Sequence, residues 1–346
     1  MNKQFFQNIN WVNLLLRLVQ IAAAVFIIIG LVNTFRNNIY SPEQWATLVF
    51  AGLAQGSIYA LIALGYSMVY GVLRLLNFAH GDVYMVGAYI GYGVLLLLLP
   101  ASGALLPTFL IILVMLLLAM IGAGILGVAI ERFAYRPLRK APRIAPLISA
   151  LGVSFVLQNL IQLTISPRPL SYGSGTLIST DSGITLGDTR IHTARLLVVG
   201  VTLALMLALT YFVRSTRMGR AIRAVSMDLD AAAMMGVNVD QVIAVTFLIG
   251  SALAGGAGVL VGIVFFSIQH TMGFLAGLKG FTASVVGGIG NIPGAVLGGL
   301  LIGITEAFAS VYISVTFKDA IAFTILVIVL LIRPSGLLGR AVLQKV

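Results

Sequence analysis

Three polar side chains and a glycine interrupt an otherwise apolar stretch of the chain at residues 76–82. Asn77, His80, Gly81 and Asp82 stand there between two long hydrophobic runs. A cytoplasmic turn explains them if Asp82 sits near the positive N-terminal end of a helix. A helix break inside the protein explains them equally, because its exposed N–H groups could bind a carboxylate or form a gate. Both interpretations remain open from the sequence.

Glu306 is a second group capable of chemistry, in the middle of an apolar run between Thr305 and Ala307. A carboxylate in the membrane interior is costly and is usually paired or functional. Pairing with a neighbouring helix and a place on a translocation path are the two alternatives. Gly280, which follows a polar break in another apolar run, is also a candidate for the path or gate.

The sequence contains no motif typical of an enzyme. There is no Gly-Lys dipeptide and therefore no Walker A loop, and the three histidines, His80, His192 and His270, are far apart. We expect no catalytic residues, no metal site and no cofactor bound by this chain. With no cysteine, disulfides and thiolate ligands are excluded.

Composition places the chain in a membrane. Of its 346 residues 60% are hydrophobic and only 9% are charged, and the mean hydropathy is +1.07. Soluble proteins carry about 25% charged residues, so lipid must be the main solvent of the outer surface. The net charge of +11 is better explained by basic cytoplasmic loops than by nucleic-acid binding.

The apolar runs predict an all-α integral membrane protein with about ten transmembrane helices. The tenth span, 274–290, is needed because the basic loops 132–143 and 214–223 and the basic C-terminal tail must all be cytoplasmic. Both termini are then cytoplasmic, and Lys279 is counted on the outer side. The predicted spans are 14–32 (an uncleaved first helix), 45–71, 83–99, 105–130, 144–165, 195–213, 242–266, 274–290, 294–313 and 320–332.

Glycine spacing suggests an internal duplication. Gly81 and Gly91 follow a polar break after one long helix, and Gly280 and Gly290 follow a break after another. The two long helices run in opposite directions in the predicted topology. Spans two to five and seven to ten would then be inverted repeats, a common plan in transporters, although chance spacing competes with this interpretation.

The inner loop 214–241 reads as helix, because 221–235 contains neither glycine nor proline. Such a helix could transmit movement into the membrane, or it could simply be a solvated connection. Arg220 and Arg223, which flank this helix, are the candidate residues for such coupling.

Several long motifs resemble the branched-chain amino-acid permeases of ABC importers, specifically the LivH-type subunit. The similarity covers about residues 46–341, and the first 44 residues look like an additional N-terminal helix region before a permease domain at 45–346. The matching stretches are 56–66 (GSIYALIALGY), 77–82 (NFAHGD), 131–139 (ERFAYRPLR), 274–283 (FLAGLKGFTA) and 287–295 (GGIGNIPGA).

The resemblance implies a role for the inner loop. Asp230-Ala231-Ala232-x3-Gly236 is similar to the EAA-x3-G signature, with Asp230 in place of glutamate. In that family the segment docks on a separate ATPase. The resemblance further implies a second homologous permease (LivM-type), two ABC ATPase subunits that bind ATP and Mg, and a periplasmic amino-acid-binding protein.

The implied function is the passage of leucine, isoleucine and valine across a bacterial inner membrane. A permease of the same superfamily for urea, short amides or another amino acid is the nearest alternative. An ion-coupled secondary transporter is a more distant one, because it would need more acidic residues within the membrane.

Overall fold

The computed structural model describes residues 42–99, 103–139, 141–142, 144–173, 177–179, 182–186, 189–312 and 315–339. The expected first helix, 14–32, lies outside these residues. Within them, eight helical segments are long and apolar enough to cross a membrane. They are α3 (Pro42–Leu73), α4 (His80–Leu98), α5 (Thr108–Ile130) with its continuation to Leu138, α6 (Ile144–Thr164), α7 (Thr193–Ser215), α10 (Val239–Phe265), α12 (Ile292–Tyr312), and α13 (Lys318–Ile332) with the 3-10 turn η3 (Val315–Phe317).

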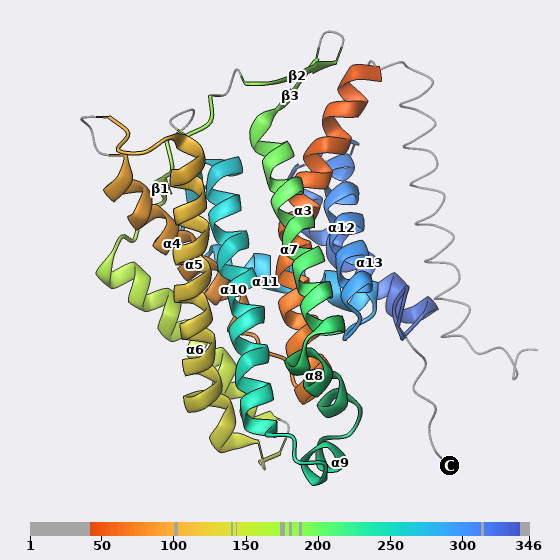
Figure 1. Ribbon diagram of the computed structural model, residues 1–346. Coiled ribbons are helices and arrows are strands. Elements are labelled where there is room, and N and C mark those ends of the chain that lie inside the picture. The colour runs from red at the N-terminus through yellow and green to blue at the C-terminus, as the bar shows by residue number, and fades with distance from the viewer. Residues whose placement is uncertain are drawn as a thin grey trace, which may run out of the picture.

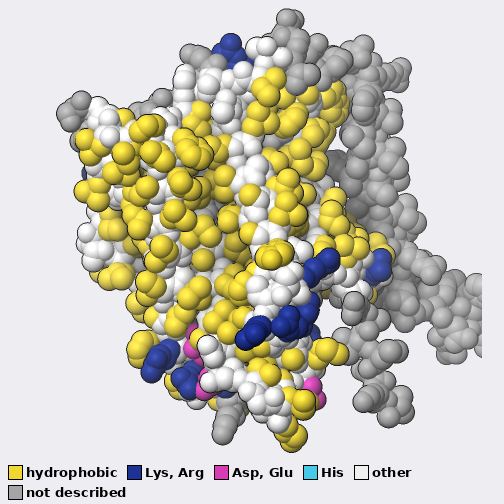
Figure 2. Space-filling view, in the orientation of Figure 1, with side chains coloured by type: hydrophobic (Ala, Val, Ile, Leu, Met, Phe, Trp, Pro, Cys, Tyr) yellow, Lys and Arg dark blue, Asp and Glu magenta, His cyan; other side chains and the backbone are white. Residues whose placement is uncertain are grey.

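Short elements lie at the two ends of this bundle (Figure 1). One end carries the hairpin of β2 (Gly183–Leu186) and β3 (Thr189–His192), and β1 (Leu170–Ser171) pairs antiparallel with β4 (Ser267–Ile268). The other end carries α8 (Arg217–Met227) and α9 (Leu229–Met234). The π-helical turn η1 (Glu131–Tyr135) and the 3-10 turn η2 (Arg136–Leu138) continue α5. Arginines gather around α8, below a broad hydrophobic surface (Figure 2), and we call this the basic end.

Helices α3 and α10 form the centre of the bundle and run in opposite directions (Figure 1). Helix α3 packs on α11 (Met272–Gly287) and α12, as α10 packs on α4 and α5. Helix α4 contacts α5 and α6, as α11 contacts α12 and α13. This correspondence is the one expected for inverted repeats built from the second to fifth and the seventh to tenth predicted spans.

The register of the duplication differs from the one that glycine spacing suggested. Among the described residues, Arg74 (φ 55°) and Phe266 (φ 56°) are the non-glycine residues with positive φ. Each follows a long central helix, and each is followed by a helix that begins six positions later. The same offset of 192 positions (74 to 266) relates Gly81 to Gly273. Gly81 therefore corresponds to Gly273 rather than to Gly280.

The predicted span 274–290 is the short helix α11. Its 16 residues reach about 24 Å, less than the hydrocarbon core of a bilayer. The irregular residues 266–271 complete the passage, because they begin at the end of the bundle that carries β4, whereas Gly290 lies beside Gly71 near the basic end of α3. The expectation that Lys279 lies on the outer side was wrong, since its 5% exposure places it inside the bundle.

Candidate functional site

The polar segment at 76–82 lies inside the bundle rather than in a surface turn. Helix α3 ends at Leu73, and the chain turns back so that His80 begins α4 beside Gly65. Gly65 is eight residues before the end of α3, about 12 Å along the helix. His80 is 1% exposed, and its ring lies edge-on to Tyr66 with centroids 4.8 Å apart. We call residues 74–79 the re-entrant segment.

The N-terminal ends of α4 and α11 meet at three glycines, Gly81, Gly273 and Gly277. A Cβ on Gly81 would lie 2.7 Å from the Cα of Gly277, and one on Gly273 would lie 2.7 Å from the carbonyl oxygen of Gly81. Backbone thus touches backbone, which only glycine permits at this spacing. We call this contact the α4–α11 junction. It puts the N-terminal ends of two helices, with their positive dipole ends, at one place within the bundle.

Asp82 is fully buried beside the junction and makes no ion pair among the described residues. Its carboxylate accepts hydrogen bonds from Ser154 Oγ and, at 3.0 Å, from Gln158 Nε2, both on α6. The N-terminal end of α4 adds a favourable dipole. These two polar side chains of α6 were not singled out from the sequence, where Ser154 and Gln158 look like ordinary residues of an apolar helix.

Asn77 connects the re-entrant segment to η1. The hydroxyl of Tyr135 donates to the carbonyl oxygen of Leu76 at 2.9 Å and lies 3.3 Å from Asn77 Oδ1. Tyr135 is fully buried and also packs against Phe247 of α10, with ring centroids 5.3 Å apart. The re-entrant segment, η1 and α10 are therefore held together at one tyrosine.

Glu306 takes part in a buried ionic cluster, the α11–α12 cluster. Lys279 Nζ lies 2.6 Å from Glu306 Oε1 and 2.5 Å from Asp319 Oδ1. The hydroxyl of Tyr59 donates to Glu306 Oε2 at 2.9 Å, and Gln55 Nε2 donates to that hydroxyl at 2.8 Å. Sequence reasoning missed Lys279 and Asp319 as partners, although a lysine and a carboxylate within apolar runs are the usual signal of such a pair.

Gly280 faces α3. A Cβ at Gly280 would lie 2.8 Å from Cβ of Ile62. Its position explains close packing of α11 on α3, and it is not part of the α4–α11 junction.

The candidate coupling residues cluster at the basic end. Asp228 caps α9 by accepting a hydrogen bond from the N–H of Ala231 at 2.9 Å, and Ala232 is 5% exposed. Gly236 ends the turn after α9 with φ +83°, a value that disfavours most side chains. Arg220 and Arg223 donate to backbone carbonyls at the C-terminal end of α7. Asp230 lies in the first turn of α9.

Around α9 the basic end exposes large apolar side chains. Met227 and Met234 are each 88% exposed, Met235 is 84% exposed and Leu229 is 41% exposed. Met227 ends α8, Leu229 and Met234 are the first and last residues of α9, and Met235 follows it. Helix α9 lies at the very end of the bundle (Figure 1). Exposed apolar clusters surrounded by polar residues mark interaction surfaces. We call Met227, Leu229, Met234 and Met235 the methionine tip.

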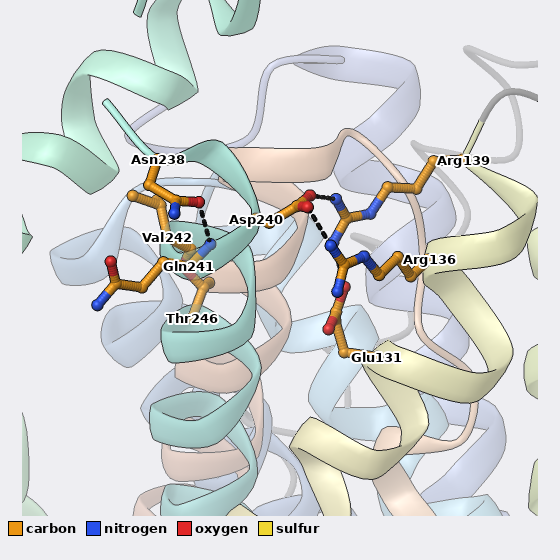
Figure 3. A network of polar contacts seen from close by, with 8 residues as sticks. All are labelled: Glu131, Arg136, Arg139, Asn238, Asp240, Gln241, Val242 and Thr246. Carbon is orange, nitrogen blue, oxygen red and sulfur yellow. Dashed lines mark hydrogen bonds and ion pairs between the residues drawn. The ribbon is translucent and has the colours of Figure 1, made fainter. Parts of the chain in front are cut away.

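Beside α9, ion pairs tie the start of α10 to the turns after α5 (Figure 3). Asp240 pairs with Arg136 and, at 2.6 Å, with Arg139. Arg139 also pairs with Glu131, whose side chain is 4% exposed. The two arginines and two carboxylates balance in charge. No group of three metal-ligating side chains occurs in the described part of the chain.

A cavity of about 260 Å³ lies at the opposite end, between α3, α7 and α10. Gln55, His192 and Arg195 give it polar walls, and Val264 and Phe265 give it apolar ones. Gln55 links this cavity to Tyr59 and thus to the α11–α12 cluster.

The known proteins to which this chain is similar are transport permeases. Residues 48–330 match the family model described as branched-chain amino acid transport system / permease component. The permease protein LivH of Salmonella typhimurium is 44% identical over 86% of this chain and 96% of its own length. BraD of Pseudomonas aeruginosa is 44% identical over 85% and 96%. The ribose import permease RbsC of Haemophilus influenzae is 24% identical over 81% of each chain.

Among solved structures, PsaBC from Streptococcus pneumoniae in complex with Fab aligns with 82% of this chain and 91% of its own, at 13% identity and a TM-score of 0.44.

Proposed function

Because the chain belongs to the family of permease components of branched-chain amino acid transport systems, we propose that it is the membrane-spanning subunit of an ATP-driven importer for leucine, isoleucine and valine. The high identity to LivH and BraD over nearly their whole length supports this substrate class. The subunit itself performs no chemistry, and ATP with Mg binds to separate ATPase subunits.

The methionine tip is the observation that carries the proposal. A helical membrane protein has little reason to expose Met227, Met234 and Met235 beyond its basic end unless another protein covers them. Unbranched, polarisable methionine side chains suit a docking surface that must adapt while its partner moves. The partner that we assign is the ATPase, which would lie in the cytoplasm.

Coupling would start at α9 and at the turn that follows it. Asp230, Ala231, Ala232 and Gly236 form the docking element, and Arg220 and Arg223 fix α8 to the end of α7. Since Asp228 caps α9 and Gly236 ends it, the helix is a defined unit that can move as one piece.

The remaining partners follow from the two ends of the bundle. A second homologous permease would complete the path, and a periplasmic binding protein would deliver the amino acid to the end that carries β2 and β3. The part of the path or gate that we assign to this subunit is Asn77 in the re-entrant segment together with His80, Gly81 and Asp82 at the start of α4. Both termini would be cytoplasmic in the bacterial inner membrane.

The test is binding-protein-dependent uptake by the assembled complex in proteoliposomes. Met234→Asp should release the ATPase during purification and abolish leucine uptake, whereas Met234→Leu keeps the apolar surface and should preserve both. Uptake of leucine, isoleucine and valine, but not of urea or ribose, is the expected substrate pattern. Uptake that survives removal of every ATPase subunit would instead favour an ion-coupled transporter.

A further inference from the structure

The re-entrant segment is tied to the coupling region at its first residue. Arg74 Nη2 donates to the carbonyl oxygen of Ser226 in the last turn of α8, at 3.1 Å. Arg74 adopts φ 55°, a left-handed conformation that is unfavourable for a non-glycine residue. This costly turn therefore places the guanidinium against the helix that precedes α9.

A second connection reaches the middle of the segment through the ion pairs of Figure 3. Asp240, four residues past Gly236, forms an ion pair with Arg139. Arg139 in turn forms an ion pair with Glu131. Glu131 and Tyr135 lie on η1, a five-residue π-helix, a rare element often found at functional sites.

Tyr135 completes this route. Its hydroxyl donates to the carbonyl oxygen of Leu76 within the segment and lies beside the Asn77 side chain. The re-entrant segment is thus held by α8 at one point and by the start of α10 at another.

The far end of the segment continues directly into the α4–α11 junction. The N–H of His80 donates to the carbonyl oxygen of Asn77 at 3.1 Å, and that of Val83 to Ala79 at 3.0 Å. Phe78 packs beside Phe281 of α11, with ring centroids 6.4 Å apart. Because interiors are close-packed, a displacement of this segment must move the N-terminal end of α4.

The corresponding segment of the other repeat, 266–271, is held differently. It begins at Phe266 with φ 56°, but its next two residues form β4, which pairs with β1. Neither α8 nor α9 lies near that strand (Figure 1). One repeat therefore has its break fixed by a strand pair, and the other has its break attached to the two coupling helices.

We propose that the re-entrant segment carries movement of α8 and α9 to the α4–α11 junction, with Arg74 and Tyr135 as positioning residues. This inference rests on the proposed function. Each link is a single hydrogen bond, so losing one should weaken coupling by up to about tenfold.

The experiment compares variants of the assembled complex by the amount of leucine transported per ATP hydrolysed. Tyr135→Phe removes the hydroxyl and keeps the ring. Arg74→Asn removes the guanidinium and keeps a residue that tolerates positive φ. Each should lower transport per ATP several-fold to about tenfold while hydrolysis continues. Arg74→Lys keeps a hydrogen-bond donor and should retain most of the transport per ATP hydrolysed.

Two control variants match these changes at the other end of the bundle. Tyr172→Phe removes a buried hydroxyl that donates to the carbonyl oxygen of Ala88 on α4, and Phe266→Asn replaces the second residue with positive φ. Both should leave transport per ATP unchanged. An unchanged ratio for Tyr135→Phe and Arg74→Asn would overturn the proposal, as would an equal fall in the controls.

Met234→Asp separates this inference from the proposed function. If that variant transports normally, the assignment of the methionine tip fails. If it loses transport but Tyr135→Phe and Arg74→Asn do not change the ratio, only the route through the re-entrant segment fails.

Discussion

Lys279 Nζ on α11 lies 2.6 Å from Glu306 Oε1 on α12, with the two side chains 6% and 2% exposed. Lys279 also pairs with Asp319 at the start of α13, so one cation holds three helices of the second repeat. Tyr59 supplies a further hydrogen bond from α3. The arrangement explains why a charged pair persists inside the membrane-spanning bundle, because each carboxylate in the cluster has a partner.

Removing Lys279 should destabilise the protein more than removing the charge of Glu306. Lys279→Met leaves both carboxylates without their cation and should destabilise the protein by about 3–5 kcal/mol. Glu306→Gln leaves the pair of Lys279 with Asp319 intact and should cost less. Thermal unfolding of the purified protein in detergent measures both variants. We also expect Glu306→Gln to transport leucine normally when corrected for protein level, and a specific loss of transport would place Glu306 on the path.

The glycine contact at the α4–α11 junction predicts a position-dependent response to alanine. A Cβ at Gly273 would lie 2.6 Å from Asp82 Oδ1, so Gly273→Ala should displace α11 and lower both stability and transport. Gly93→Ala on α4 is the control, because no atom lies within 4 Å of its added Cβ. It should be neutral or stabilise by about 0.5–1 kcal/mol. Equal unfolding temperatures for the two variants would contradict the close approach.

Single cysteines can establish which end faces the cytoplasm, because the natural chain has none. Met235→Cys is expected to react with a membrane-impermeant maleimide only in inverted vesicles, and Ser182→Cys only in intact spheroplasts. Lys279→Cys should stay unlabelled from both sides, since the side chain is buried. Labelling of Met235→Cys from outside the cell would reverse the orientation and remove the basis for ATPase docking.

Much of the fold could be predicted from hydrophobicity alone. The apolar runs located the eight described spans, because lipid demands about 20 apolar residues per helix. The inverted pairing of the repeats was also predicted, but its register was not. Gly280 and Gly290 mimic the spacing of Gly81 and Gly91, whereas the true correspondence lies in the backbone of Arg74 and Phe266. A positive φ at a residue such as Arg74 or Phe266 cannot be recognised from the sequence.

The candidate sites were predicted in part, for similar reasons. The break at 76–82 was recognised by its polar residues, and the structure places it inside the bundle. Ser154 and Gln158 were missed because hydroxyl and amide groups are common in membrane helices and gain meaning only beside Asp82. The positive-inside rule assigned Lys279 to the outer side, since it counts charges without regard to pairing. Asp319 escaped notice at a helix end, where acidic residues are ordinary.

The turn after α9 permits a test that separates backbone conformation from side-chain chemistry. Gly236 has φ +83°, and its Cβ position faces open space. Any substitution there acts through the backbone and not through a clash. Gly236→Val should be strained by about 1–2 kcal/mol or more, because β-branched residues avoid positive φ. The strain would be relieved by moving α9 relative to α10, so we expect ATPase binding and leucine uptake to fall.

Asparagine tolerates the left-handed region, so Gly236→Asn should keep most of the uptake. Both variants should insert into the membrane in normal amounts, because the turn lies outside the apolar spans. The measurement is co-purification of the ATPase together with leucine uptake at matched protein levels. If valine and asparagine were equally tolerated, the left-handed turn would be irrelevant to docking. If both abolished uptake, the partner would have to contact the glycine itself, and its surface would then reach past the methionine tip to the start of α10.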